Sequence, residues 1–149
     1  MIIRTAQEGD YFSAVGLYAE FGNRVPPITG EEGRDQWKTL LGHPGTTVVV
    51  AEVAEQIVAM VTIHILPNMT YAGRPYALIE HVIATEEIRG QGVAKQVMER
   101  AIKTAWEADA YKIMLLTGKN NAAKGFYEKL GFSDDDKYGM TLRKVAARY

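Results

Sequence analysis

The 149-residue sequence predicts an α/β fold with one mixed, mostly antiparallel central sheet flanked by about four helices. Runs rich in β-branched residues come early in the chain, and a long apolar stripe at helical spacing follows them. A short apolar run at 112–116 then has the character of a strand that is covered on both faces, and is therefore parallel to its neighbour. We expect residues 1–149 to form a single domain, because this length is typical of one domain and no linker divides it.

The first third of the chain predicts a strand and two helices. Residues 2–5 read as the strand, and Asp10 as the N-cap of a helix that ends at 22–23. The spacing of a capping box over residues 29–32 starts a second helix, which 43–45 closes. The apolar residues expected to anchor these two helices are Ala14, Leu17, Tyr18 and Phe21 in the first, and Trp37, Leu40 and Leu41 in the second.

The middle of the chain predicts three antiparallel strands. Residues 46–53 and 57–66 are rich in Val, Ile and Thr and are separated by a few residues around Glu55, which is the pattern of a hairpin. After a loop at 67–75, residues 77–85 form a strand that is apolar except for Glu80 and His81.

The last part predicts a helix, a parallel strand, a second helix and a final strand. Residues 91–107 carry one continuous apolar stripe with charged residues opposite. Together with the strand at 112–116 this helix makes a βαβ unit. The helix over 122–130 is expected to end in a Schellman motif, with Gly131 as its left-handed residue and Phe132 as the apolar contact. Residues 138–144 read as the final strand.

Composition excludes several classes of function. The chain has no Cys, which rules out disulfides, thiolate zinc sites and a covalent thiol intermediate. A net charge of −1 argues against a nucleic-acid partner, and no apolar run approaches the roughly 20 residues of a membrane span. His43, His64 and His81 lack the spacing of metal ligands, so we expect no metal. Without a secretory signal pattern the expected location is cytoplasmic.

The segment between the third long strand and the long helix has the character of a phosphate site. A strand that turns through Arg89, Gly90, Gln91 and Gly92 into a helix offers several unpaired backbone N–H groups. The glycines allow close approach of a ligand, and Arg89 and Lys95 add positive charge. An ordinary strand-to-helix turn remains the alternative for this segment alone. A dinucleotide fingerprint and a P-loop are excluded by residue identity.

Two motifs in order resemble those of the GNAT superfamily of acetyl-CoA-dependent N-acetyltransferases. The pyrophosphate signature Arg/Gln-x-x-Gly-x-Gly/Ala is met by Arg89, Gly92 and Ala94. Some thirty residues later, the segment 120–132 (NNAAKGFYEKLGF) is similar to the family's Asn-x-x-Ala-x-x-Phe-Tyr-x-Lys-x-Gly-Phe. The order of predicted elements also resembles the GNAT fold over essentially the whole chain.

The resemblance implies a place for the cofactor. In that fold the strands that hold Glu80 and Leu115 splay apart, and acetyl-CoA, the cosubstrate, lies in the gap. The backbone groups of Val82 and Ala84 would bind the pantetheine arm and the acetyl carbonyl, and Asn120 would lie near the reactive end. The residues implied for the pyrophosphate are Arg89, Gly90, Gln91, Gly92, Val93, Ala94 and Lys95. The loops at 21–30 and 67–75 match no assigned feature of the family.

The resemblance also implies two catalytic residues. An amine attacks a thioester only when neutral, so a base must accept its proton. Glu80 resembles the strand glutamate that does this in several GNAT enzymes; a structural carboxylate in a buried ion pair is the alternative. Tyr127 resembles the tyrosine that protonates the departing thiolate, with a core aromatic as its alternative. Strand alternation predicts that His81 points to the face opposite Glu80.

These features together predict an N-acetyltransferase that moves the acetyl group of acetyl-CoA to a primary amine of a small molecule by direct attack. The open alternatives are acetylation of a protein or peptide amine, and a module that binds acetyl-CoA as a sensor without turnover. Because self-association is a tendency of the family, a homodimer is a further expectation.

Overall fold

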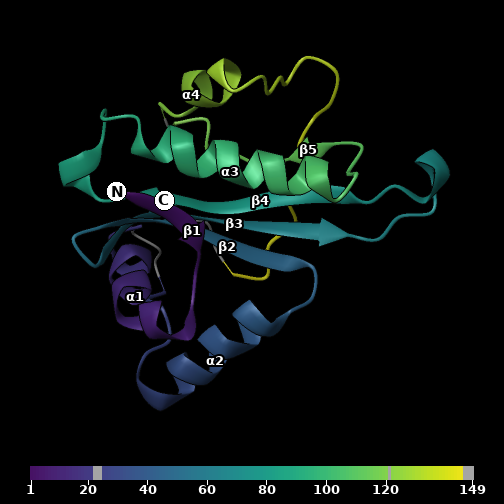
Figure 1. Ribbon diagram of the computed structural model, residues 1–149. Coiled ribbons are helices and arrows are strands. Elements are labelled where there is room, and N and C mark those ends of the chain that lie inside the picture. The colour runs from purple at the N-terminus through teal and green to yellow at the C-terminus, as the bar shows by residue number, and fades with distance from the viewer. Residues whose placement is uncertain (22–24, 121, 146–149) are drawn as a thin grey trace.

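The computed structural model describes residues 1–21, 25–120 and 122–145 (Figure 1). The predicted end of the first helix at 22–23 lies outside these residues. Short 3₁₀ turns precede α1, β4 and α3 at Glu8–Asp10, Tyr71–Gly73 and Glu86–Ile88. Along the chain the longer elements are β1 (Ile2–Thr5), α1 (Tyr11–Glu20), α2 (Gly30–Gly42), β2 (Thr46–Val53), β3 (Gln56–Leu66), β4 (Tyr76–Ala84), α3 (Val93–Glu107), β5 (Ile113–Met114) and α4 (Lys124–Lys129).

The five strands form one sheet in sequence order, which confirms the predicted mixed topology. Strands β1 to β4 pair antiparallel, and β5 pairs parallel to β4 through the α3 crossover. The β2–β3 hairpin turns at Ala54 and Glu55, both with positive φ of 48° and 63°. The structure therefore reproduces the predicted order of elements up to the last helix.

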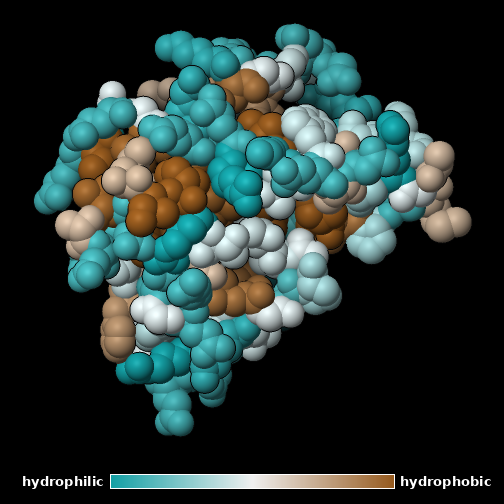
Figure 2. All heavy atoms as spheres, in the orientation of Figure 1, coloured by the Kyte–Doolittle hydropathy of each residue, from teal (hydrophilic) through white to brown (hydrophobic). Residues whose placement is uncertain are grey.

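Helices cover both faces of the sheet, with α1 and α2 on one side and α3 and α4 on the other (Figure 1). Alternate strand residues feed the two cores: Val61 and Ile63 pack with α3, whereas Met60 packs with α1 and α2. On the face that Figure 2 presents, brown apolar atoms show mainly between the two helical layers, and hydrophilic side chains cover the helices. Met1 and Ile2, at the β1 edge, are more than half exposed.

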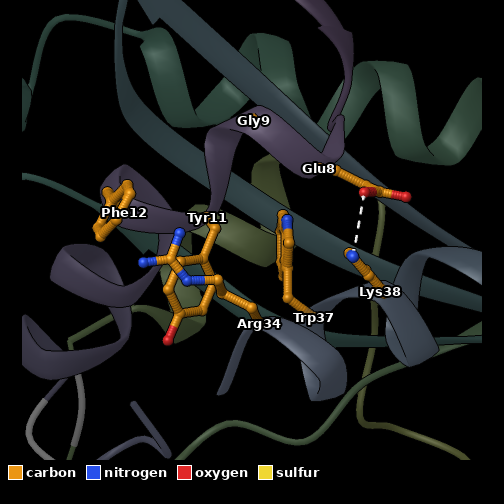
Figure 3. Close-up of a pocket in the computed structure, with 7 residues that line it drawn as sticks. All are labelled: Glu8, Gly9, Tyr11, Phe12, Arg34, Trp37 and Lys38. Atoms are coloured by element: carbon orange, nitrogen blue, oxygen red, sulfur yellow. Dashed lines mark ion pairs between the residues drawn. The ribbon is translucent and has the colours of Figure 1, made fainter. Parts of the chain in front are cut away.

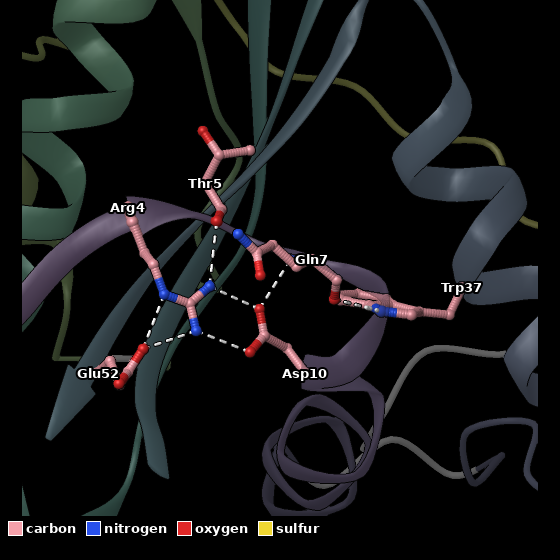
Figure 4. Close-up of polar contacts among 6 residues, drawn as sticks. All are labelled: Arg4, Thr5, Gln7, Asp10, Trp37 and Glu52. Atoms are coloured by element: carbon pink, nitrogen blue, oxygen red, sulfur yellow. Dashed lines mark hydrogen bonds and ion pairs between the residues drawn. The ribbon is translucent and has the colours of Figure 1, made fainter. Parts of the chain in front are cut away.

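A charged cluster fastens the start of the chain to the sheet (Figure 4). Arg4 in β1 donates to both carboxylate oxygens of Asp10 at 2.8 Å and to Glu52 of β2 at 2.7 Å. Asp10 also accepts the backbone N–H of Gln7, whose carbonyl in turn accepts from the Trp37 ring. Asp10 thus precedes α1 as predicted, but its carboxylate binds Arg4 and Gln7 and makes no capping bond to the helix.

Asp10→Asn should lower the free energy of unfolding at neutral pH by about 1.5 to 3 kcal/mol, the usual worth of hydrogen bonds to charged groups. Arg4 holds the pKa of Asp10 below its ordinary value of 3.8. Because the pKa of Asp10 is lower in the folded than in the unfolded protein, the charged carboxylate stabilises the fold at pH above the unfolded-state pKa. This stabilisation is lost as pH falls through the folded-state pKa. The difference between the two proteins should therefore vanish only in acid well below pH 4, as measured by urea denaturation.

The control for this prediction is Asp134→Asn, which removes one side of the exposed Lys124–Asp134 ion pair (2.9 Å). Surface pairs contribute little, so this variant should unfold like the parent protein. Equal stability of the Asp10 and Asp134 variants at neutral pH would contradict a structural role for the Arg4 cluster.

The capping box predicted at the start of α2 is not formed. Thr29 is the N-cap, but its side chain makes no capping hydrogen bond, and Gly30 enters the helix with φ of +69°. This left-handed entry differs from the extended N-cap followed by right-handed helix that a capping box requires. The helix is held instead by the Tyr11 hydroxyl, which donates to the Gly30 carbonyl. Gly33 is needed there, since a Cβ would collide with Tyr11 and the Ile28 backbone.

The predicted Schellman end of α4 is confirmed. Gly131 has φ of +93°, and its N–H donates to the Glu128 carbonyl at 2.9 Å. The N–H of Phe132 donates to the Tyr127 carbonyl at 3.1 Å, and the Phe132 side chain joins the core on the α3 side.

The final strand predicted over 138–144 is wrong. These residues form no strand, and the side chains of Tyr138, Met140 and Leu142 are almost fully exposed. Alternation of residue types indicates only that a segment suits a pleated surface; a strand also needs a neighbouring edge with which to pair. In the described part of the chain the sheet ends at β5, which pairs over two residues only.

Candidate active site

The outer edge of β4 is largely unpaired. Among the described residues, β5 covers this edge only opposite Ala77 and Leu78, and β4 then continues for six residues with none of the described strands beside it on that side. At one end Ala77 donates its N–H to Lys112 on the β5 side, and at the other Thr85 donates to Val58 on the β3 side, both at 2.9 Å. Backbone N–H and C=O groups of successive strand residues face opposite sides of the strand. Starting from Ala77 at one end and from Thr85 at the other, this alternation directs the backbone groups of Ile79, Val82 and Ala84 toward the unpaired side of β4.

The assignments from the two ends of β4 would conflict in a regular strand. They are compatible because β4 contains one extra residue, a bulge at His81. The β3–β4 register shifts between Met60 and Thr62, and His81 has φ of +53°. The extra residue turns His81 toward α1, where its ring makes edge contacts with Tyr18 and Phe21 at centroid distances of 5.4 and 5.9 Å. The prediction that His81 points away from the Glu80 face is therefore wrong, because a bulge interrupts strand alternation.

Glu80 immediately precedes the bulge and lies on the α1 side of the sheet. It pairs with Thr62, while the flanking pair Ile63 and Ile79 packs on the α3 side. The side chains of Val82 and Ala84 belong to the α3-side core, so Glu80 does not share their face as a regular strand would require. Glu80 is exposed, and its carboxylate makes no ion pair or hydrogen bond among the described residues. This speaks against the alternative of a buried ion pair.

Tyr127 extends from α4 toward the same region. Its ring lies between Phe126 and Phe132, with centroid distances of 5.2 and 6.2 Å. Burial raises the pKa of Tyr127, and the negative charge of Glu80 raises it further. The phenol therefore stays protonated at neutral pH, and the carboxylate is close enough for its charge to act on it.

The glycine turn opens α3 as predicted. Gly90 and Gly92 have φ of +78° and +77°, and apart from their chain neighbours no atom lies within 4 Å of where a Cβ would stand on either. The first helical hydrogen bond runs from Gln96 to Gly92, which leaves the N–H groups of residues 93–95 at the free end of the helix. An anion can approach these donors closely.

The cations beside the turn lie at the surface. Arg89 pairs with Glu86 at 3.3 Å and Lys95 with Glu99 at 3.2 Å, and all four side chains are exposed. Gln91 donates to the Glu87 carbonyl at 2.8 Å, which braces the turn. Because surface pairs of this kind are weak, Arg89 and Lys95 can exchange them for a phosphate.

Asn120 is exposed and lies between β5 and α4, on the chain segment that follows the gap. Its neighbour 121 lies outside the described residues. The loop at 67–75 is held by the Asn68 amide, which donates to Thr70 and to the Arg74 carbonyl.

Three residues that the sequence analysis left unconnected come together on the α1 side of the sheet. The Oγ1 atom of Thr46 lies 2.9 Å from Nδ1 of His43 and 2.8 Å from Nδ1 of His64. Burial lowers the pKa of His64, and the charge of Glu80 acts in the opposite direction. His43 and Thr46 are three residues apart and are joined by a turn, in which the Thr46 N–H donates to the His43 carbonyl at 3.0 Å. His64 is distant in sequence, and the strand pairing of Thr46 with His64 brings it to them.

Two cavities lie near the helices and strands described above. One, between α1 and α2, is lined by Tyr11, Trp37 and charged residues, with the Arg34 guanidinium 4.7 Å from the Phe12 ring centroid (Figure 3). It contains none of the predicted site residues. The other, of about 490 Å³, lies where β4 ends and is lined by Glu20, Thr85, Glu86 and Glu87. Its carboxylates would repel a phosphate and attract a cation.

No helix in the described part of the chain is long and apolar enough to cross a membrane. Among those same residues, no group of three or more His, Cys, Asp or Glu side chains could hold a metal ion.

Comparison with known proteins gives consistent matches. The sequence model of the Acetyltransferase (GNAT) family matches residues 11–132. A solved structure of a putative acetyltransferase from Agrobacterium tumefaciens str. C58 is 39% identical, with a TM-score of 0.91 over 97% of this chain and 100% of that one. A transcriptional regulator from Bacillus halodurans C-125 is 30% identical, with a TM-score of 0.82 over 95% and 98% of the two chains. A glucosamine 6-phosphate N-acetyltransferase from Trypanosoma brucei brucei is 27% identical over 87% of each chain.

Proposed function

Because the chain belongs to the acetyltransferase (GNAT) family, we propose that it transfers the acetyl group of acetyl-CoA to a primary amine of a small molecule by direct attack. The observation that carries the proposal is the unpaired edge of β4, which runs from Glu80 to the glycine turn of α3. All of residues 1–149 would act as one N-acetyltransferase domain.

The residues present suit the cofactor. Its pantetheine amides can pair with the free backbone groups of Val82 and Ala84, as a neighbouring strand would. The pyrophosphate fits the N–H groups at the start of α3, where the glycines leave space and residues 89 and 95 supply charge. Asn120 lies on the segment that would border the reactive end. When bound, the cofactor supplies an acetyl thioester, which an amine can attack.

The proposed proton movements use Glu80, Val82 and Tyr127. Glu80, exposed and unpaired among the described residues, accepts the proton of the attacking amine. The Val82 N–H faces the gap and donates to the oxygen that becomes negative. Tyr127, whose raised pKa keeps it protonated, gives its proton to the departing sulfur. A serine or cysteine intermediate is not needed.

A small-molecule acceptor is supported by a relative that is 27% identical and is named for acetylation of an amino sugar phosphate. The rival acceptor is a lysine or N-terminal amine of a protein.

The proposal is tested by incubating the protein with acetyl-CoA and a panel of amino sugars, amino sugar phosphates, polyamines, amino acids and peptides. CoA release is followed in time, and each product is identified by mass spectrometry. Turnover with a small amine is expected. Turnover with peptides alone would replace the substrate class, and binding of acetyl-CoA without CoA release would contradict catalysis.

Tyr127→Phe should lower kcat by about 10²-fold, the lower end for loss of a general acid, with little change in acetyl-CoA affinity. The ring would still pack between Phe126 and Phe132, so only the proton donor is removed. Steady-state kinetics and calorimetry measure the two quantities. The matched control is Tyr138→Phe, at a ring that is 98% exposed. A wild-type kcat in the Tyr127 variant would assign this ring to the core alone.

A further inference from the structure

The bridge from Thr46 to two histidines constrains where their protons lie. A hydroxyl carries one hydrogen, so it can donate to Nδ1 of only one ring. The other Nδ1, at a distance that also indicates a hydrogen bond, must then carry its own hydrogen and donate to Oγ1. When both rings are neutral, His43 and His64 therefore hold opposite tautomers: one has a bare Nε2, and the other an Nε2–H.

This chain of bonds begins next to Glu80. His64 is two residues from Thr62, the strand partner of Glu80, so His64 and Glu80 are diagonal neighbours on the same face. The titratable groups whose charges act on His64 are Glu80 from β4 and His43 from the end of α2.

The chain of bonds ends in solvent. Thr46 is buried, His64 is half-buried, and His43 is exposed at the C-terminal end of α2. A bound amine and acetyl-CoA would cover the approach to Glu80. The hydrogen-bonded chain from His64 through Thr46 to His43 then gives the proton a route to solvent that avoids the reacting groups.

We propose that His64, Thr46 and His43 form a relay that carries the proton of the acceptor amine from Glu80 to solvent. This inference rests on the proposed function. A bridging water carries the proton from the Glu80 carboxyl to Nε2 of His64, and the hydrogen on Nδ1 of His64 passes to Thr46. The Thr46 hydroxyl hydrogen moves to Nδ1 of His43, and the Nε2–H of His43 leaves to water. One proton enters and one leaves, and both rings exchange tautomers.

The relay works only while both rings are neutral. Burial lowers the pKa of His64, so this ring remains neutral to more acidic pH than an ordinary histidine. As pH falls and His64 becomes protonated, the relay stops. The activity of the wild-type protein should then approach that of a variant without the bridge.

The test removes the bridging hydroxyl with Thr46→Val. A relay that only exports the proton should contribute less than the base itself, so kcat is expected to fall about 10-fold, against the about 10² to 10⁴-fold of a general base. The KM for acetyl-CoA should not change. Imidazole buffer should restore the rate, since a mobile base can collect the proton. Thr46→Ser retains the hydroxyl and should keep the wild-type kcat. Thr47→Val, one residue along the strand on the other face, should also behave as wild type.

Two further measurements keep the test independent of folding. His43→Ala removes the exposed end of the chain, where loss of fold is not expected, and should show the same loss and the same rescue by imidazole. Nitrogen-15 chemical shifts of the wild-type rings at alkaline pH should report one Nδ1–H and one Nε2–H tautomer.

Three results would overturn the relay alone: an unchanged rate in Thr46→Val, a loss that imidazole does not relieve, or identical tautomers in the two rings. A wild-type protein that acetylates no amine of the panel would instead overturn the proposed function, and the relay with it.

Discussion

Glu80→Gln should lower kcat by about 10² to 10⁴-fold near neutral pH, with acetyl-CoA affinity close to that of wild type. Glutamine keeps the size of the side chain but cannot accept the proton of the amine. The deficit should shrink as pH rises toward the amine's own pKa, about 10.4 for a lysine-like group, because free amine then needs no base. Rates measured from mildly acidic to strongly alkaline pH check this.

The matched control is Glu55→Gln, at an exposed glutamate of the β2–β3 turn, which should have wild-type kinetics. Since Glu80 is itself exposed and unpaired among the described residues, neither variant should lose its fold. A Glu80→Gln protein with an unchanged rate at every pH would show that the base is another group. A marked fall in its stability would revive the structural interpretation of this carboxylate.

Gly92→Asp should weaken acetyl-CoA binding by about 10²-fold. A carboxylate a few ångströms from the pyrophosphate repels it by a few kcal/mol at an effective dielectric constant of about 20. The φ of Gly92, +77°, strains most side chains, but Asp and Asn tolerate it better than other residues. Gly92→Asn is therefore the control, because it matches the shape and the backbone strain without the charge.

Calorimetry with acetyl-CoA measures both variants. The Asn protein should bind within about tenfold of wild type, since beyond the neighbouring residues no atom lies within 4 Å of the added Cβ. Increasing salt should reduce the difference between Asp and Asn, because it screens the exposed charges. Equal affinities in the two variants would place the pyrophosphate elsewhere.

The features predicted well from sequence are those determined by nearby residues. Gly131 and Phe132 specify the end of α4 through bonds that span six residues. The apolar stripe of α3 and the alternation of β2 and β3 likewise depend on short-range periodicity. The glycine turn was predictable because glycine is the residue that most readily adopts positive φ, and Gly90 and Gly92 have φ near +78°.

The features missed depend on distant partners. Nothing in the residues around His81 indicates a bulge, which arises from how β4 aligns with β3. The pairing of Thr46 with His64 is set by the length of the hairpin that joins them. The sequence around Tyr138 has the alternation of a strand, but whether a strand forms depends on an edge with which it can pair.

Because β4 and β5 pair over two residues only, part of the β4 edge lacks the hydrogen bonds that a neighbouring strand would supply. A bound metabolite would take the place of that strand. If acetyl-CoA fills that seam, part of the hydrogen bonding that a neighbouring strand normally supplies comes from the cofactor. A ligand at 100 times its Kd adds about 2.7 kcal/mol to the stability of the state that binds it. The lifetime of the folded protein in a cell would then follow the supply of acetyl-CoA, so that a shortage of the acetyl donor would reduce both the rate and the amount of the enzyme.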